Sequence, residues 1–504
     1  MNKIYSKNQQ GLLFFASTIL LLIMVLQPIQ AQEKSQYTLQ EVIRLAQDQS
    51  PDAQIARHRF KSSYWQYRNF KAEYLPNLQF DGTLPNVNRS IEAVTLPDGT
   101  SNYISRSLTN YEVSLSLSQN VGFTGGKVFL NTGLSQMNNY YADTTTSQYL
   151  ANMVNIGISQ PIFKYNEYKW RKRIEPMQYE EAKRVLVEAN EEVASVAVDR
   201  FFSLLIAQIE KEISLKNQSN YDTLYRIAKG RYQLGKIAEN DLLQLELNLL
   251  QANAAMENAD LNYETRLSAF KSYLRLKGDH PVTLIPPGET NHFVVSADKA
   301  IEEAKNNSSD GLAFQRRLIE AESEVNRAKM LGRFDADIYA VLGLTQTSDI
   351  LRDAYKNPLD EERVTVGISV PILDWGLAHG RIKLAESKQD LETASVEQER
   401  IDYTQNIFVN VMQFNMQKNQ LRIAAKSDTV AQKRYDVTQK RYMIGKINDV
   451  LDLNLAQIDN DNAKIGYYRS LMTYWKSYYQ IRKITLYDFE HNTPIMVSFD
   501  DLIR

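Results

Sequence analysis

The sequence predicts a chain that is mostly α-helical, carries membrane β-structure and is internally duplicated. Three observations support this fold class. Short phrases recur in the same order in the two halves, of which RYQLGKI (231–237) and RYMIGKI (441–447) are the clearest. Long stretches, such as 381–444, contain neither Gly nor Pro. Segments that alternate apolar and polar residues end in clusters of aromatic residues.

Composition narrows the class of protein. The 504 residues are enough for several ordinary domains or one long repeated one. Charged residues make up 23% of the chain, yet the net charge is only −2, which gives no sign of a nucleic-acid partner. The chain has no cysteine, so disulfides, thiolate metal sites and a lipid-bearing N-terminal cysteine are excluded.

The first 31 residues read as an export signal. Lys3 and Lys7 precede the apolar run 11–27, and Ala31 supplies a small residue at the cleavage point. An uncleaved membrane anchor is the alternative, because the run is near the lower length limit for spanning a bilayer. We expect cleavage, and therefore an exported protein.

The phrases of the two halves align at two constant offsets. Thr38 and Asp52 match Ser296 and Asp310 at an offset of 258. IGISQPIF (156–163) matches VGISVPIL (366–373) at 210, the offset that also joins the two RY phrases. This constant order predicts an internal duplication. The change of offset places about 48 extra residues between 80 and 156 of the first half, including YEVSLSLSQ (111–119) and KVFLNTGLS (127–135) joined as a hairpin.

Each half reads as a helix, then strands, then long helices. Thr38 with Glu41 forms a predicted capping box, followed by an apolar helix face at Leu39, Val42, Ile43 and Ala46. Long helices are expected in the Gly- and Pro-free stretches 177–229, 236–277 and 381–444, as in coiled-coil assemblies. A soluble helical rod remains an alternative for these helices alone.

Strands are expected within about 78–160, and at about 336–345 and 363–373. Aromatic residues follow their ends, as in the girdles of outer-membrane barrels: Phe163, Tyr165, Tyr168, Trp170 and Trp375. Each half has too few strands to close a barrel, and an open sheet is not tolerated in lipid. If these strands meet outer-membrane lipid, several chains must therefore share one barrel; a small periplasmic sheet is the alternative.

This combination resembles the TolC-like outer-membrane efflux family. The resemblance rests on the signal peptide, the duplicated halves, the YLPNL lead into strand, the GISQPIF strand and the long helices that end at a Gly turn, and it covers about 37–487. It implies a homotrimer whose chains share one transmembrane β-barrel, with two strand pairs from each chain, continued by a periplasmic coiled-coil α-barrel. The expected parts are a signal peptide (1–31), a first repeat (32–288), a second repeat (289–487) and a C-terminal tail (488–504).

The resemblance also assigns candidate site residues. The two Gly turns match helical tips at which a periplasmic adaptor protein docks: Leu234, Gly235, Lys236, Ile444, Gly445 and Lys446. Tyr442 matches a tyrosine that links neighbouring helices in the closed state, and Asp449 and Asp452 match aspartates that form rings in the closed pore. The alternatives are plain helical corners for the tips and a solvated acidic face for the aspartates.

The expected function is a passive exit duct in the bacterial outer membrane, extending into the periplasm. It would complete an efflux or type I secretion system driven by an inner-membrane pump of RND, ABC or MFS type. The five histidines are scattered and no nucleotide-binding or hydrolase motif occurs, so we expect no enzyme, no cofactor and no metal. The alternative is a non-porous periplasmic coiled-coil scaffold or adaptor. The sequence does not name the cargo or the pump class.

Overall fold

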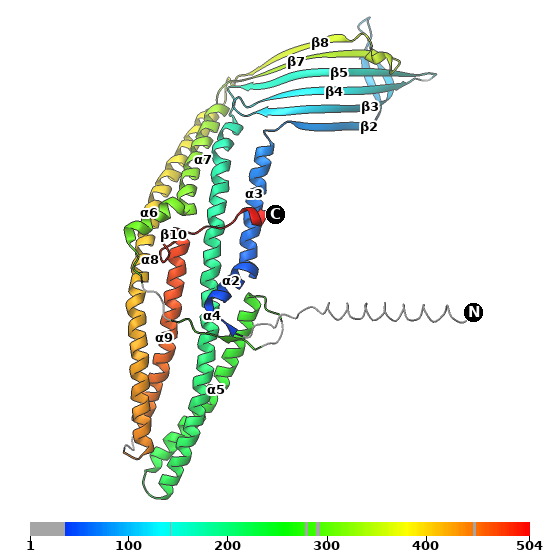
Figure 1. The fold of residues 1–504 in the computed structure, drawn as a ribbon. Helices are drawn as coiled ribbons and strands as arrows, with labels where there is room; N and C mark the ends of the chain where they lie inside the picture. The colour runs from blue at the N-terminus through cyan, green and yellow to red at the C-terminus, as the bar shows by residue number, and fades with distance from the viewer. Residues whose placement is uncertain (1–35, 142, 278–280, 289–292, 447–449, 504) are drawn as a thin grey trace, which may run out of the picture. The chain divides into compact units, whose positions relative to one another are not determined.

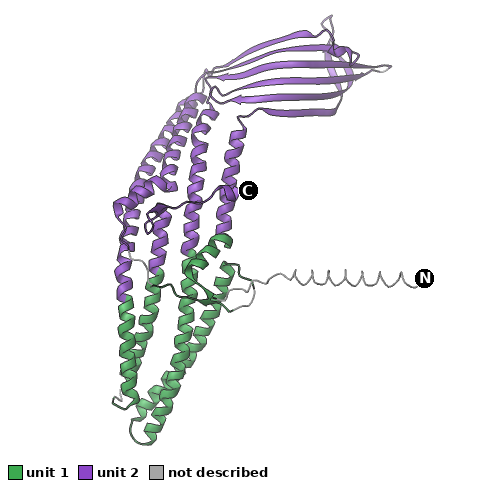
Figure 2. Ribbon diagram, viewed as in Figure 1, with its two compact units in different colours: residues 1–50, 196–290, 424–472 green, residues 51–195, 291–423, 473–504 purple. Residues whose placement is uncertain are grey.

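The computed structural model describes residues 36–503 except for 142, 278–280, 289–292 and 447–449. The predicted signal segment (1–31) and Asp449 lie outside the described residues. The chain divides into two compact units (Figure 2). Unit 1 comprises residues up to 50, 196–290 and 424–472, and unit 2 comprises 51–195, 291–423 and 473–504. Each unit therefore combines segments from both halves of the sequence.

Two helices of 67 residues each account for much of the chain. They are α4 (Glu167–Gln233) and α8 (Leu377–Met443), each about 100 Å long at 1.5 Å per residue. Each contributes residues to both units, as does α9 (Val450–Thr485). Gly380 lies in the first turn of α8, whereas Pro176 lies nine residues inside α4. The stretches 177–229 and 381–443 contain no Gly or Pro, which favours their long helices.

Unit 1 also holds α2 (Leu39–Gln49), α5 (Glu239–Tyr273) and a short parallel pair of β1 (Gln36–Tyr37) with β6 (Thr283–Leu284). The predicted capping box at the start of α2 is confirmed. The Thr38 backbone N–H donates to the Glu41 carboxylate at 3.0 Å, and the Glu41 N–H donates to the Thr38 hydroxyl at 3.4 Å. The predicted apolar face of α2 is buried throughout.

Unit 2 contains the shorter helices and a sheet. Its helices are α3 (Pro51–Ala72), α6 (Ala297–Asn307), α7 (Ser309–Leu331), the 3-10 helix η1 (Asp353–Tyr355) and α10 (Asp500–Ile503). β9 (Tyr487–Asp488) and β10 (Thr493–Pro494) form a small antiparallel pair in the C-terminal region. Phe499 of this region packs on Phe60 of α3, with ring centroids 5.5 Å apart, so the tail is part of the packed structure of unit 2.

The sheet of unit 2 has six antiparallel strands in chain order (Figure 1). They are β2 (Asn77–Thr95), β3 (Ser101–Val121), β4 (Gly126–Tyr140), β5 (Thr145–Ile162), β7 (Asp335–Ser348) and β8 (Leu359–Ser369). The expectation of one strand pair from each half is therefore wrong for the first half, which supplies four strands. The hairpin predicted from 111–119 and 127–135 is confirmed as β3 and β4. β8 ends at Ser369, four residues before the predicted end, and Pro371, which lacks a backbone donor, lies just beyond it.

The same order of elements occurs twice along the chain. Two helices, strands and two long helices appear as α2 to α5 and again as α6 to α9. The repeat boundaries 32–288 and 289–487 stay a prediction. None of the helices in the described residues has a span that is both long and apolar enough to cross a membrane.

Candidate functional site

The two RY phrases form nearly identical helix ends in unit 1. At the end of α4 the Gly235 N–H donates to the Tyr232 carbonyl at 2.8 Å and the Lys236 N–H donates to the Arg231 carbonyl at 2.9 Å. These are the two hydrogen bonds of a Schellman cap. Gly235 takes the positive φ of +65° that this cap requires, as predicted for a glycine at this corner.

The end of α8 repeats the cap bond for bond. Gly445, with φ +74°, donates to the Tyr442 carbonyl at 3.0 Å, and Lys446 donates to the Arg441 carbonyl at 3.0 Å. The prediction of a left-handed glycine is confirmed here also. We call residues 231–237 the first tip and residues 441–446 the second tip. The repeated phrase is therefore the sequence of a helix C-cap followed by a reversal of the chain.

Arg231 joins the two tips. Its Nη2 donates to the Met443 carbonyl at 3.0 Å and to the Tyr442 carbonyl at 3.3 Å, and its guanidinium lies 5.4 Å from the centroid of the Tyr442 ring. The last carbonyls of a helix have no partner within the helix and carry its negative dipole end. The Arg231 guanidinium of the first tip thus donates hydrogen bonds to the last carbonyls of α8 at the second tip.

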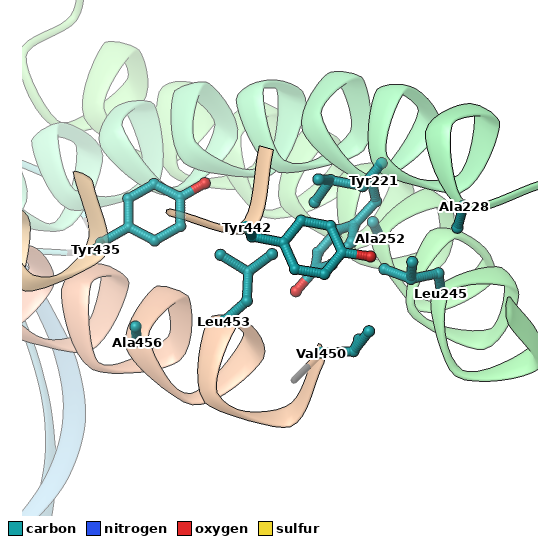
Figure 3. Packing of buried hydrophobic residues seen from close by; sticks show 10 residues of the cluster. Tyr221, Ala228, Leu245, Ala252, Tyr435, Tyr442, Val450, Leu453 and Ala456 are labelled. Carbon is teal, nitrogen blue, oxygen red and sulfur yellow. The ribbon is translucent and has the colours of Figure 1, made fainter. Parts of the chain in front are cut away.

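Tyr442 is at the centre of the core beside the tips. Its side chain is 1% exposed and belongs to one cluster of buried residues in unit 1. Figure 3 shows Tyr442 close to Leu453 and Val450 of α9, with Leu245 of α5 beside it. Burial raises the pKa of Tyr442, so the hydroxyl stays neutral. Among the described residues this hydroxyl has no hydrogen-bond partner, so Tyr442 holds the helices here by packing.

The outer surface of the tips combines apolar and basic groups. Leu234 is 72% exposed and Ile444 is 65% exposed. Lys236 and Lys446 are exposed beside them. Because Arg231 connects the tips, Leu234 and Ile444 belong to one end of unit 1. Figure 1 shows the C-terminal ends of α4 and α8 at the same end. These apolar and basic side chains are therefore available to a partner.

Of the two candidate gate aspartates, only Asp452 can be placed. It lies in the first turn of α9, where its carboxylate accepts from Arg434 Nη2 at 3.2 Å. Arg434 also donates to Asp459 at 2.6 Å. All three side chains are about half exposed, so solvent screens these ion pairs and each contributes little to stability. Arg434 nevertheless offsets part of the negative charge of Asp452.

Sequence reasoning missed Arg231 and Arg434 as members of this site. Arg231 was visible as the first letter of the repeated phrase, but its cross-tip contact depends on which helix lies beside it. Arg434 lies 18 residues before Asp452 on another helix, and no local spacing pairs them. In both cases the missing information is tertiary.

The five candidate interface aromatics of unit 2 differ in exposure. Trp375 is 90% exposed and Phe163 is 55% exposed. Tyr165 and Tyr168 are half-buried, and the Tyr165 hydroxyl is 2.6 Å from the Ser323 hydroxyl. Trp170 does not fit the prediction, because its ring is only 8% exposed and the Arg173 guanidinium lies over it. A lipid-interface role stays a prediction for the other four.

The fold matches solved outer-membrane channels along nearly the whole chain. The Campylobacter jejuni CmeC outer membrane channel aligns with a TM-score of 0.65 at 17% identity, covering 92% of this chain and 88% of that one. The outer-membrane channel OprN aligns at 0.63 and 15%, covering 89% of each chain. VceC of Vibrio cholerae aligns at 0.61 and 12%, covering 91% and 97%. No curated protein matches the chain in sequence. At these identities the structures establish the fold, a TolC-like α/β-barrel.

A family model identifies the class of protein. The model of the outer membrane efflux protein matches residues 126–274 and 300–473, more than half of the chain. The chain belongs to this family. It is an outer-membrane exit duct of an efflux system that extends into the periplasm, and it is not an enzyme. The non-porous scaffold considered from the sequence is therefore not supported.

Proposed function

We propose that three copies of the chain share one membrane barrel and that the paired tips are the surface on which a periplasmic adaptor docks. The observation that carries the proposal is the Arg231 bridge, which brings Leu234 and Ile444 to one end of unit 1. A partner that inserts apolar side chains between the tips would bury both residues at once. The inner-membrane pump behind the adaptor supplies the energy, and its class stays open.

The same bridge suggests how docking opens the mouth. Arg231 holds the end of α8 through two carbonyls, and Tyr442 packs that end against α5 and α9. A partner that spreads the tips removes the guanidinium from these carbonyls and exposes the ring. The binding energy of the adaptor would offset this loss, so opening depends on the partner.

The acidic residues near the second tip supply the charge of the mouth. Asp449 and Asp452 of three copies would form rings that attract cations and repel anions. Arg434 weakens the ring of Asp452 while its ion pair is intact. Because Asp449 and Asp452 would both contribute carboxylates to the mouth, cation selectivity should depend on both.

Conductance of the purified protein in a planar bilayer tests the pore and its mouth. The wild-type protein should give small, uniform, cation-selective steps that divalent cations block from the periplasmic side. Replacing both Asp449 and Asp452 with Ala should weaken selectivity and block. Glu257→Ala, which removes an exposed carboxylate 18 residues inside α5, is the matched control and should keep both properties. Unchanged selectivity in the double variant would refute the rings, and absence of any steps from folded trimer would refute an open duct.

Docking is tested separately at the tips. Leu234→Glu with Ile444→Glu should abolish cross-linking of the tips to the adaptor and leave bilayer conductance unchanged. Leu215→Glu, at another exposed position on α4 in unit 1, is the control and should cross-link as the wild type does. Equal cross-linking of the double variant would show that the adaptor binds elsewhere.

A further inference from the structure

An apolar row crosses the sheet of unit 2 from strand to strand. Each member is the direct cross-strand partner of the next, in the order Leu78, Leu117, Leu130, Ile156 and Leu342. All five side chains are exposed, although they are apolar. The row includes one residue from each of β2, β3, β4, β5 and β7. A continuous exposed apolar row of this length requires a non-aqueous neighbour.

The opposite face of the same strands is polar. One residue along, the direct partners are Gln79, Ser116, Asn131 and Asn155. Ser116, Asn131 and Asn155 are less exposed than the apolar residues beside them. Membrane barrels show this alternation, with apolar side chains toward lipid and polar side chains toward the lumen. β3 and β4 show the same alternation as β2 and β5, with their apolar side chains on the same face of the sheet.

The turn between β3 and β4 is fixed to the helices of unit 2. The Asn166 side chain, just before α4, donates to the carbonyls of Gly122 and Phe123 at 3.2 and 3.1 Å. The Gln119 side chain donates to the carbonyl of Tyr74, which follows α3, at 3.2 Å. β3 and β4 are also paired with each other and with β2 and β5 along nearly their whole lengths. This hairpin is therefore built into the sheet, and it is neither an external loop nor a plug.

The two outer strands of the sheet leave edges that fit each other. β2 leads away from α3 and β8 leads toward α8, so with six antiparallel strands the two edges run in opposite directions. β8 of one copy can thus continue the antiparallel pattern beside β2 of the next. Unpaired backbone groups cost several kcal/mol each in lipid, so the edges must be paired there.

We propose that the barrel wall of this protein contains all six strands of every chain, with β8 of one copy paired to β2 of the next. This inference rests on the proposed assembly of three copies, and such an assembly has 18 strands. The resemblance to the family implied four strands a chain and hence 12. Barrel diameter grows roughly in proportion to strand number, so the membrane passage is about one and a half times wider than a 12-stranded one. Barrels of about this strand number enclose an aqueous channel, so size selection would lie at the helical mouth.

Single cysteines test whether β3 and β4 belong to the wall, because the chain has no cysteine of its own. In proteoliposomes, a membrane-impermeant maleimide should label Ser116→Cys and Asn131→Cys. Leu117→Cys and Leu130→Cys, which face lipid, should be labelled only after the protein is denatured. Leu78→Cys and Gln79→Cys, on β2, are the matched controls, because β2 belongs to the wall with either strand number.

The outcomes separate this inference from the proposed function. Labelling at 117 and 130 as strong as at 116 and 131, with 78 still protected, would overturn the wider barrel and leave the duct intact. Labelling at 78 as well, in protein that gives no conductance, would refute the membrane barrel itself.

Deletion of residues 101–144 gives a second test. It removes β3 and β4 and joins β2 to β5 through the turn 96–100, leaving four strands. The largest polyethylene glycol that enters from the extracellular side, detected as a fall in conductance, should have a radius about one and a half times larger for the wild type than for the deletion variant. Equal cut-offs for two conducting trimers would contradict the inference. If the deletion variant does not fold, the cysteine labelling alone decides.

Discussion

The first and second tips have almost the same sequence and the same backbone, yet their side chains differ in burial. Tyr442 is 1% exposed, whereas Tyr232, at the same place in the first tip, is 41% exposed. The equivalent arginines differ in the opposite sense. Arg231 of the first tip is half-buried against the second tip, whereas Arg441 of the second tip is exposed. Local sequence therefore determines the cap, and the neighbouring helix determines what is buried.

The comparison also indicates what a single chain lacks. The second tip has the first tip beside it, so Arg231 can bind its carbonyls. The first tip has no such neighbour on the side of Tyr232 within the described part of one chain. In the proposed ring of three copies, the second tip of the next copy would occupy that side, with its Arg441 facing the end of α4. The following variants test this difference between the tips.

The largest effect is expected at the tyrosines. Tyr442→Ala should destabilise the packing of α8 on α5 and α9 by about 3–5 kcal/mol, because it leaves a large cavity in a buried cluster. Tyr232→Ala should cost less than about 1 kcal/mol in the dissociated chain, because its side chain is already partly in water. Hydrogen exchange of amides in 221–252 and 435–456 measures the free energy of local opening.

Tyr442→Phe separates packing from hydrogen bonding in the same experiment. Because the hydroxyl has no partner among the described residues, the Phe variant should exchange as slowly as the wild type. Rapid exchange in Tyr442→Phe would show that the hydroxyl has an essential partner. Equal losses for the two Ala variants would contradict the asymmetry of the tips.

A smaller effect is expected at the arginines. Arg231→Ala removes two charge-assisted hydrogen bonds to the end of α8 and should weaken the contact between the tips by about 2 kcal/mol. In bilayers the variant should conduct more than the wild type. Arg441→Ala is the matched control in the dissociated chain, where it should change stability by no more than about 0.5 kcal/mol.

The assembled protein provides the sharper test. If the first tip of each copy meets Arg441 of the next, Arg441→Ala should raise conductance as Arg231→Ala does. A rise in conductance for Arg231→Ala alone would mean that the ring does not repeat the contact seen within one chain.

The sequence predicted best those features that depend on neighbouring residues in the chain. The left-handed glycines of both tips, the length of α8 and the capping box of Thr38 and Glu41 follow from local rules. The second half shows how far such rules extend. Ser296 occupies the place of Thr38, but Lys299 replaces Glu41, so a capping box is not possible there, and the Ser296 side chain makes no cap hydrogen bond. Lys299 instead donates to the Tyr487 hydroxyl at 3.3 Å and to the Asn492 side chain at 2.8 Å.

The remaining features required knowledge of tertiary neighbours. The extra residues of the first half could be recognised as a hairpin from their alternation, but not as two strands within one six-stranded sheet, because strand alternation does not identify the partner strand. Trp170 was grouped with interface aromatics because it follows a strand. It lies one turn inside α4, where Arg173 covers it. Arg231 was missed as a bridge for the same reason.

The smallest effect concerns a second pair of equivalent positions in unit 1. Asp461 of α9 is partly buried and accepts from the Asn217 side chain of α4 at 2.7 Å. Asn253 of α5, the equivalent position 208 residues earlier, is also partly buried and accepts from the Gln218 side chain of α4 at 2.9 Å, but it cannot ionise. Burial raises the pKa of Asp461, although hydrogen bonds from Asn217 and Asn460 and the charges of Lys216 and Lys464 oppose the shift. The protonated carboxyl is thus the form that the folded state favours.

Stability should therefore depend on pH at Asp461. Because its folded pKa lies above the ordinary value of 3.8, its contribution is fully present below that value and is lost as pH rises through the raised pKa. Asp461→Asn, which is neutral at every pH, should gain stability relative to the wild type as pH increases through this window. Urea unfolding of both proteins at a series of pH values measures the difference. Asp459→Asn, at an exposed ion pair, is the control. A difference between Asp461→Asn and the wild type that stays constant with pH would show that the carboxylate enters the folded state without penalty, and that burial at this second-half position has no electrostatic consequence.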